Sequence, residues 1–463
     1  MADDAIRRDP ASVEPAIPFR TAVRVWFAIS LQTFGGPAGQ IAVMQRTLVD
    51  DKRWIGQRRF LHAMNYCMLL PGPEAQQLAT YVGWLLHGTR GGLVAGGFFV
   101  LPGVLALLAL SAVYVAFGST VAVSALFAGL APAVLSIVVQ AVIRVGRRAL
   151  TDPALVALAV ASFLALFLFA VPFPVVVLVA GVAGWALGRW RSGAVLQTGK
   201  ADPADDGPPP VIPDDALHTE RPSGRRTLRV LLVGLLVWWV PIAAVALVTG
   251  AHSTLTAEGL FFSGTAVVTF GGAYAVLAYV SHQAVQVYGW LAPGEMVRGL
   301  ALAETTPGPL IMVVQFVAFL GAYRDPGALD PWAAAVLASL LVTWVTFVPS
   351  FLFVLVGAPY MEQLRGNRSL SAALTGITAA VVGVIANLGV YFAVHTLFRH
   401  TLSVRSSGLA LELPDPSTLR PLALGIAVVA AVLIFRLRWS VLRTLGVCAV
   451  LGLAAGLSGL TVT

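Results

Sequence analysis

The chain has 463 residues, of which 58% are hydrophobic and only 11% are charged, and its mean hydropathy is +0.83. This composition excludes a soluble globular protein and predicts an integral membrane protein. The net charge of +8 indicates arginines that flank and orient membrane helices, not a surface for nucleic acid.

The first 19 residues carry acids and bases before any apolar run, unlike the layout of a signal peptide. We therefore expect residues 1–19 to remain as a cytoplasmic N-terminal tail. Beyond this tail, apolar runs reach the roughly 20 residues that span hydrocarbon, and their continuous pattern favours helices over barrel strands. Such runs are Leu93–Phe117, Val121–Ile143, Ala154–Leu187 and Ala333–Val356.

Glycine and proline interrupt two apolar segments in the first half, residues 20–190. The breaks are Phe34-Gly35-Gly36 and Pro71-Gly72-Pro73. In lipid, such a break is tolerated only where protein or a watery cavity satisfies the freed backbone groups. Pro37 and Pro73 can each open a new helix, at a position that needs no backbone donor.

The distribution of charge predicts how this half is oriented. Arginines gather at Arg46 to Arg59, Arg144 to Arg148 and Arg189 to Arg191, whereas the turns near Gly118 and Pro172 carry no charge. The positive-inside rule assigns the charged turns and the N-terminus to the cytoplasm. That assignment needs each broken segment to return to the side it entered, as a helical hairpin. Whether the segments are re-entrant or fully spanning stays open.

A polar stretch, residues 191–228, separates the halves, and we expect a disordered cytoplasmic linker. In residues 229–463 the breaks recur at the same spacing as Phe270-Gly271-Gly272 and Pro307-Gly308-Pro309, which indicates an internal duplication. An added span, Val230–Thr249, and a reversed arginine distribution would leave the second copy upside down. We predict an all-α polytopic membrane protein with two inverted-topology repeats and broken or re-entrant helical hairpins, which is typical of secondary transporters.

The four helix breaks form the predicted substrate site. Helix N-termini present free N–H groups and a partial positive charge, which suit an oxyanion, and a tetrahedral divalent anion fits four such ends facing one another. For any single glycine the alternative is tight helix packing. Neutral side chains would orient the anion. These donors are Gln40, Gln76, Gln77, Gln315, Thr33, Thr269, Thr305 and Thr306.

Two carboxylates lie at or beside the Pro-Gly-Pro breaks. Glu74 and Glu304 are candidates for proton coupling or gating, because a carboxylate inside the membrane is costly and functional by default. The alternative is that Glu74 complements the N-terminus of its helix and that Glu304 lies near a watery vestibule.

The strings Phe34-Gly35-Gly36-Pro37 and Pro71-Gly72-Pro73-Glu74-Ala75-Gln76, with their counterparts in the second half, resemble the chromate ion transporter family over both halves. The resemblance implies a fused duplication with halves of opposite orientation, which exports chromate from the bacterial cytoplasm and confers resistance. The second copy has Ala273 where the first has Pro37, and Leu310 where the first has Glu74, so the site is expected to be asymmetric.

We therefore predict a secondary active exporter of chromate that works by alternating access; the alternative is a transporter for uptake or exchange of sulfate or another oxyanion. Residues and resemblance together assign substrate binding to Thr33, Phe34, Gly35, Gly36, Pro37, Gln40, Pro71, Gly72, Pro73, Glu74, Gln76, Gln77, Thr269, Phe270, Gly271, Gly272, Thr305, Thr306, Pro307, Gly308 and Pro309.

The remaining expectations concern chemistry, partners and location. The sequence has no nucleotide-binding loop and no paired-cysteine motif, so we expect neither an ATP-driven pump nor an enzyme, and no cofactor or metal. The expected partners are chromate, with sulfate as a competitor, and the lipid bilayer, without nucleic acid; a homodimer stays open. The expected location is the bacterial inner membrane, multi-pass, with a cytoplasmic N-terminus.

Overall fold

The computed structural model of the protein describes residues 17–34, 36–68, 70–190, 210–212, 223–270, 273–360, 368–406 and 409–459. Over these residues the chain is helical except for connecting segments and one antiparallel hairpin of β1 (Thr401–Ser406) and β2 (Leu409–Pro414). Six of the described helices are long and apolar enough to cross a membrane. The prediction of an all-α polytopic membrane protein is confirmed.

The first half begins with short helices and continues with long ones. Its elements are α1 (Phe19–Ser30), α2 (Gly36–Gln45), the π-helical turn η1 (Arg46–Asp51), α3 (Gln57–Cys67), α4 (Glu74–Phe117), α5 (Val121–Ala149), α6 (Pro153–Phe169) and α7 (Phe173–Trp190). New helices begin at Gly36 and Glu74, where the breaks predict them. The apolar run Ala154–Leu187 forms two helices, α6 and α7, because the chain turns at a left-handed Ala170.

The second half follows the same order after one additional helix, α8 (Gly224–Thr249), which contains the predicted extra span. Short helices and a π-helical turn again precede long helices. The elements are α9 (Thr254–Val268), α10 (Ala273–His282), η2 (Gln283–Val287), α11 (Glu295–Thr305), η3 (Leu310–Met312), α12 (Val313–Arg324), α13 (Pro331–Gly357), η4 (Ala358–Tyr360), α15 (Arg368–Leu397), η5 (Pro416–Thr418), α16 (Pro421–Ala431), η6 (Val432–Arg436) and α17 (Val441–Leu457).

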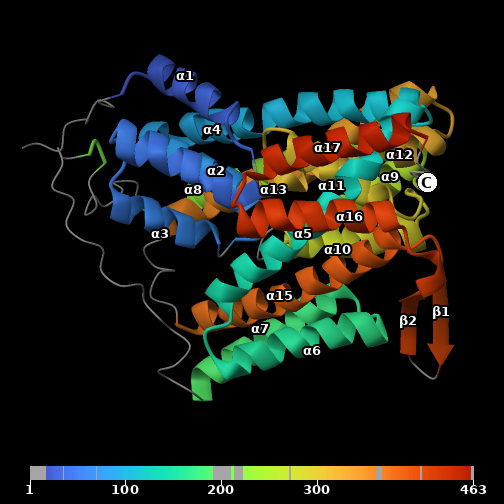
Figure 1. Cartoon of the computed structure of the whole chain (residues 1–463). Coiled ribbons are helices and arrows are strands. Elements are labelled where there is room, and N and C mark those ends of the chain that lie inside the picture. The colour runs from blue at the N-terminus through green and yellow to red at the C-terminus, as the bar shows by residue number, and fades with distance from the viewer. Residues whose placement is uncertain are drawn as a thin grey trace, which may run out of the picture.

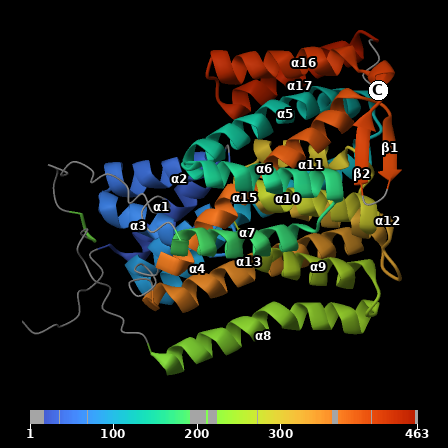
Figure 2. The same ribbon diagram turned by 90° about the horizontal axis from the view of Figure 1, so that it is seen from below.

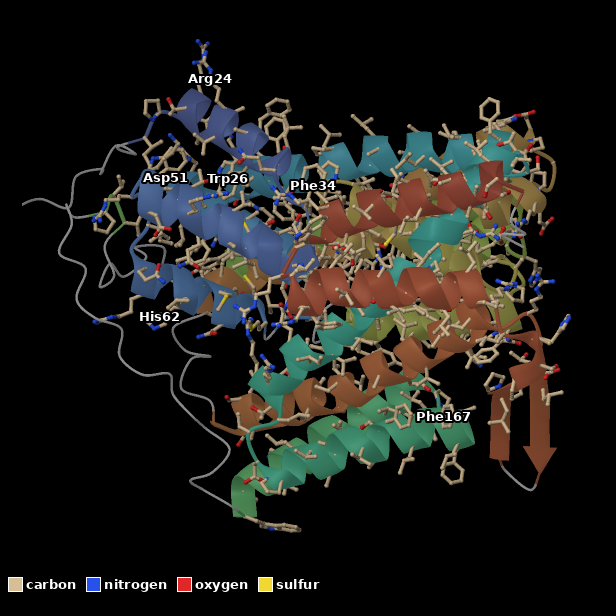
Figure 3. All side chains as sticks on the ribbon, in the orientation of Figure 1. Arg24, Trp26, Phe34, Asp51, His62 and Phe167 are labelled. Atoms are coloured by element: carbon tan, nitrogen blue, oxygen red, sulfur yellow. The ribbon has the colours of Figure 1, made fainter. Side chains whose placement is uncertain are left out.

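The short helices of the two halves lie toward different ends of the bundle. Figures 1 and 2 show α1, α2 and α3 together at one end, here called the proximal end, and α9 and α12 toward the opposite, distal end, where the β-hairpin also lies. Figure 3 shows the polar side chains of Arg24, Asp51 and His62 at the proximal end, with Phe34 farther toward the middle of the bundle.

Helix α4 is a hairpin of two helices and not one long rod. The backbone leaves helical geometry at His87 and at Gly88, whose φ is +60°. A Cβ built at Gly83 would meet the carbonyl oxygen of Gly91 at 2.5 Å, so the two arms pack closely side by side. His87 Nε2 lies 2.9 Å from the carbonyl oxygen of Ile17, next to the start of α1. The segment that follows Pro71-Gly72-Pro73 thus returns to the proximal end.

Two hydrophobic clusters hold the helices together. The larger joins buried side chains of α5, α10 to α13 and α15, and the smaller lies among α1 to α4. Helix α13 connects them, because Val342 belongs to the larger cluster and Val354 to the smaller. By contrast, only 11% of an 18-residue apolar stretch of α8 is buried, and Figure 2 shows this helix at the edge of the bundle. Such an exposed apolar face is suited to lipid.

Candidate functional site

Two backbone hydrogen bonds join the helix breaks of the two halves. The N–H of Gly72 donates to the carbonyl oxygen of Thr269 at 2.8 Å, and the N–H of Gly308 donates to the carbonyl oxygen of Thr33 at 3.0 Å. Each bond links a Pro-Gly-Pro break of one half to the residue just before the Phe-Gly-Gly break of the other. The fold therefore brings the four predicted breaks together in two equivalent pairs.

Glycine is required at the centre of both Pro-Gly-Pro breaks. Gly72 has φ +128° and Gly308 has φ +104°, which L side chains rarely adopt. A Cβ at Gly72 would lie 2.8 Å from Nε2 of Gln77 and 3.1 Å from Oγ of Ser350. A Cβ at Gly308 would lie 3.3 Å from the Cα of Gly103. Each break thus packs against a long helix of the other half, next to that helix's internal proline.

Those two prolines occupy corresponding positions in the two halves, each directly before the residue that a break contacts. Pro102 precedes Gly103 in α4, and Pro349 precedes Ser350 in α13. Proline inside a helix removes one backbone hydrogen bond and weakens the helix locally. Both long helices are therefore locally weakened next to the break that they contact.

The predicted amide side chains are buried; two of them bind the backbone of the breaks, and two bind the long helices that the breaks contact. Gln40 donates to the carbonyl oxygen of Gly308, and Gln77 donates to that of Pro71 at 2.7 Å. Gln76 accepts from Ser350 at 2.7 Å across the halves, and Gln315 donates to the carbonyl oxygen of Val104 at 3.0 Å. In this conformation these amides support the site by positioning its backbone.

The predicted threonine hydroxyls cap the helices that lead into the breaks. The hydroxyls of Thr33, Thr269, Thr305 and Thr306 donate to carbonyl oxygens of Ser30, Thr265, Leu302 and Ala303, each three or four residues earlier. In this conformation these hydroxyl protons are therefore engaged by backbone carbonyl oxygens and are not available to an anion. Free donors lie in the first turn of α4, where the backbone N–H groups of Glu74, Ala75 and Gln76 have no acceptor among the described residues.

The remaining predicted residues frame the same region. Phe34 and Phe270 are half-buried where α1 and α9 end, and Pro37 lies in the first turn of α2. Pro71, Pro73, Pro307 and Pro309 form the two Pro-Gly-Pro breaks. Gly35, Gly271 and Gly272 lie outside the described residues.

The two predicted carboxylates have different surroundings. Glu304 is buried and accepts a hydrogen bond from the hydroxyl of Tyr274 at 2.5 Å. Glu74 is half-buried in the first turn of α4, where a negative charge complements the helix dipole. Both roles considered for Glu74, coupling and complementing its helix, are compatible with this position.

Three further charged residues were not singled out by sequence reasoning. Arg148 of α5 interacts electrostatically with Glu74, and Arg144 of the same helix interacts with Glu304. The sequence marks both arginines only as orientation signals, because they are distant from the breaks along the chain. Glu258 of α9 is completely buried, and neither of its carboxyl oxygens has a hydrogen-bond partner among the described residues.

Metal ligands do not gather in this region. Within the part of the chain that the structure describes, no group of three or more His, Cys, Asp or Glu side chains could hold a metal ion. Cys67 and Cys448 are buried as free thiols.

Comparison with known proteins gives a consistent set of similarities. The family described as "Chromate transporter" matches residues 20–185 and 258–454. The "Chromate transport protein" of Pseudomonas aeruginosa is 30% identical over 456 residues, covering 97% of this chain and 93% of the relative. The protein of the same name from Cupriavidus metallidurans is 28% identical, over 80% of this chain and 82% of the relative. The "Probable chromate transport protein" of Synechococcus elongatus is 26% identical, over 91% of this chain and 97% of the relative. No solved structure matches.

Proposed function

The chain belongs to the chromate transporter family, and from this premise we propose that it is a secondary active transporter that exports chromate from the bacterial cytoplasm and confers chromate resistance. Its relatives are named transport proteins, which supports a transporter and not an enzyme. The single observation that carries the site assignment is the matched pair of hydrogen bonds that joins Gly72 to Thr269 and Gly308 to Thr33.

The proposed architecture consists of a cytoplasmic tail (residues 1–19), a first repeat (20–190), a cytoplasmic linker (191–228) and an inverted second repeat with one added span (229–463). Three observations support it: the shared order of short helices and breaks, the opposite ends toward which α1 to α3 and the pair α9 and α12 lie, and the matched bonds across the halves. Arg46 and Arg58 flank the proximal end, which supports a cytoplasmic assignment of that end in the inner membrane.

The proposed binding site lies where the breaks meet. The free N–H groups in the first turn of α4 would donate to a tetrahedral oxyanion, and the positive end of the helix dipole would favour its charge. The two repeats would then rock about their paired breaks and expose the anion to one side at a time. Neutral donors bind an anion without the strong attraction of a buried cation, which suits release.

Sulfate uptake or exchange is the alternative function. Backbone N–H groups bind any tetrahedral oxyanion of the same charge, and discrimination between ions of the same shape needs additional specific contacts. The family membership is what favours chromate.

Accumulation of labelled chromate in inside-out membrane vesicles tests the proposal. We expect vesicles with the protein to accumulate chromate above empty vesicles, and excess sulfate to reduce the accumulation. Right-side-out vesicles should not concentrate chromate under the same conditions. Absence of accumulation in inside-out vesicles, together with sulfate uptake in right-side-out vesicles, would replace chromate export by the alternative.

We further propose that the protonation state of Glu74 or Glu304 gates transport. Replacing the gating carboxyl by Gln removes its titration, so we expect Glu74→Gln or Glu304→Gln to lose the part of the pH dependence between about 5 and 8 that this carboxyl contributes. Initial rates of chromate transport over this pH range measure the effect. Asp50→Asn, at an exposed carboxylate of η1, is the control and should keep the wild-type profile. Wild-type profiles in both Gln variants would assign both carboxyls a structural role.

A further inference from the structure

A cavity with charged and hydroxyl side chains in its wall lies at the distal end, apart from the helix breaks. Its volume is about 280 Å³, near the lower end of the range for small-molecule sites. The cavity lies between α5, α11, the end of α15 and the start of α16. The side chains used in the argument are Ser124, Phe127, Arg298, Thr396 and Arg420.

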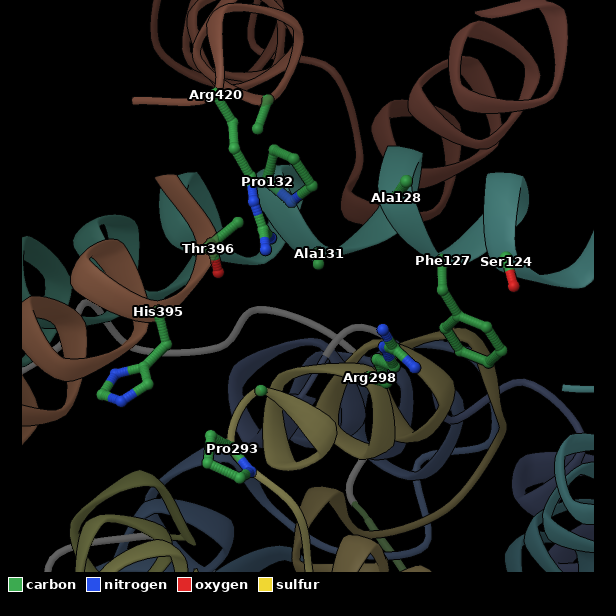
Figure 4. A pocket seen from close by; sticks show the side chains of 12 residues that line it. Ser124, Phe127, Ala128, Ala131, Pro132, Pro293, Arg298, His395, Thr396 and Arg420 are labelled. Atoms are coloured by element: carbon green, nitrogen blue, oxygen red, sulfur yellow. The ribbon is translucent and has the colours of Figure 1, made fainter. Parts of the chain in front are cut away.

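Two arginines reach this cavity from different walls. Figure 4 shows the guanidinium groups of Arg298, from α11, and Arg420, from the start of α16, pointing into the same space. None of the described residues that line the cavity carries a carboxylate. The lining therefore has at least two positive charges and no negative side chain to balance them.

The nearest carboxylate along the chain is already paired elsewhere. Glu295 follows the cavity residue Gly294, but its oxygens accept from both terminal nitrogens of Arg324 at 2.8 and 2.7 Å. Glu295 also accepts from the hydroxyl of Tyr114 at 3.0 Å. Arg298 in turn donates to that hydroxyl at 3.0 Å, which leaves its charge without a direct carboxylate partner among the described residues.

The guanidinium of Arg420 has fewer hydrogen-bond partners than that of Arg298 among the described residues. Its Nε is buried and has no hydrogen-bond partner among the described residues. Burial, and then repulsion from Arg399 and Arg298, lowers the pKa of Arg420 below its usual value. An unpaired, partly buried guanidinium is unfavourable, and a planar pair of N–H donors matches an oxyanion.

We propose that this cavity is a second oxyanion site, in which Arg298 and Arg420 hold a tetrahedral anion at the distal mouth of the protein. Thr396, which also lines the cavity, can add a hydroxyl donor. The occupant is either a free oxyanion or the phosphate of an anionic lipid headgroup. The identification of the free ion as chromate on its exit path rests on the proposed function, whereas the anion site itself does not.

Binding to the purified full-length protein in nanodiscs of zwitterionic lipid tests this proposal. Radiolabelled chromate is the probe, and Gly72→Val, which blocks the helix-break site, is the background. We expect Arg298→Gln and Arg420→Gln to weaken the remaining binding about tenfold or more, since each removes hydrogen bonds from a charged donor. Arg420→Lys should retain part of the binding. Arg443→Gln, an exposed arginine outside the cavity, is the matched control.

Thermal unfolding and native mass spectrometry complete the test. Without anion, Arg420→Gln should unfold no earlier than the wild type, because it removes a repelled charge; added sulfate should stabilise the wild type more than this variant. If a headgroup fills the cavity, anionic lipid will remain on the wild type and be lost from both Gln variants. Unchanged chromate binding with unchanged lipid retention would overturn the site. A wild type that binds at the cavity but does not transport chromate would overturn only the proposed function.

Discussion

Replacing Gly72 or Gly308 with valine will reduce chromate transport about tenfold or more, while the protein still inserts into the membrane. Forcing a side chain into a backbone conformation reserved for glycine costs on the order of 1–3 kcal/mol, and about 1.4 kcal/mol corresponds to a factor of ten. At Gly72 the new side chain would also meet Gln77 and Ser350, and at Gly308 it would meet Gly103. In both variants the hydrogen bond that joins the two halves would be strained.

The measurement is the initial rate of chromate accumulation in inside-out vesicles that contain equal amounts of each variant. Gly97→Val is the matched control, because Gly97 also lies in α4 but a Cβ there meets no atom within 4 Å. We expect this control to transport at close to the wild-type rate. Normal transport by both Gly72→Val and Gly308→Val would exclude the helix breaks as the substrate site.

Collapse of the membrane potential will remove most chromate accumulation. Moving one charge through 100 mV is worth about 2.3 kcal/mol, so a dianion gains about 4.6 kcal/mol, which corresponds to a concentration ratio on the order of 10³. Chromate leaving a negative cytoplasm, or entering a positive vesicle lumen, would use this energy directly. The proposed secondary transport needs such a source of energy.

Two ionophores separate the potential from the proton gradient. Valinomycin with potassium on both sides collapses the potential, and we expect chromate accumulation to fall to the equilibrium level. Nigericin removes the pH gradient, and accumulation should then largely persist. The opposite pattern would contradict potential-driven export and would make proton exchange, with Glu74 or Glu304 as carrier, the driving reaction.

Sequence patterns predicted much of the architecture because a bilayer restricts the choices of the chain. Continuous apolar runs have to become helices, since lipid offers no partner for free backbone groups. For the same reason a Pro-Gly-Pro string in such a run has to end one helix and begin another, and α4 begins directly after Pro73. The helix order and the family were thus accessible from sequence, whereas the inverted orientation stays a prediction.

The roles of individual polar residues were less accessible. Closeness to the breaks along the chain predicts eight neutral donors for the anion, whereas in this conformation Thr33 caps its own helix and Gln77 binds the carbonyl oxygen of Pro71. The interactions of Arg144 with Glu304 and of Arg148 with Glu74 could not be predicted from the sequence, because these residues are far apart along the chain and α5 brings them near one another only after folding. Direction of transport, substrate choice and coupling stay predictions.

The sequence by itself determined that this protein is a helical membrane protein with duplicated helix breaks, since hydrophobic length and the missing N–H of proline act locally. Only the tertiary structure decided which groups meet. The bonds from Gly72 to Thr269 and from Gly308 to Thr33, and the approach of Arg298 to Arg420, join segments far apart in the chain. Their physical cause is the packing of whole helices, which no local pattern encodes.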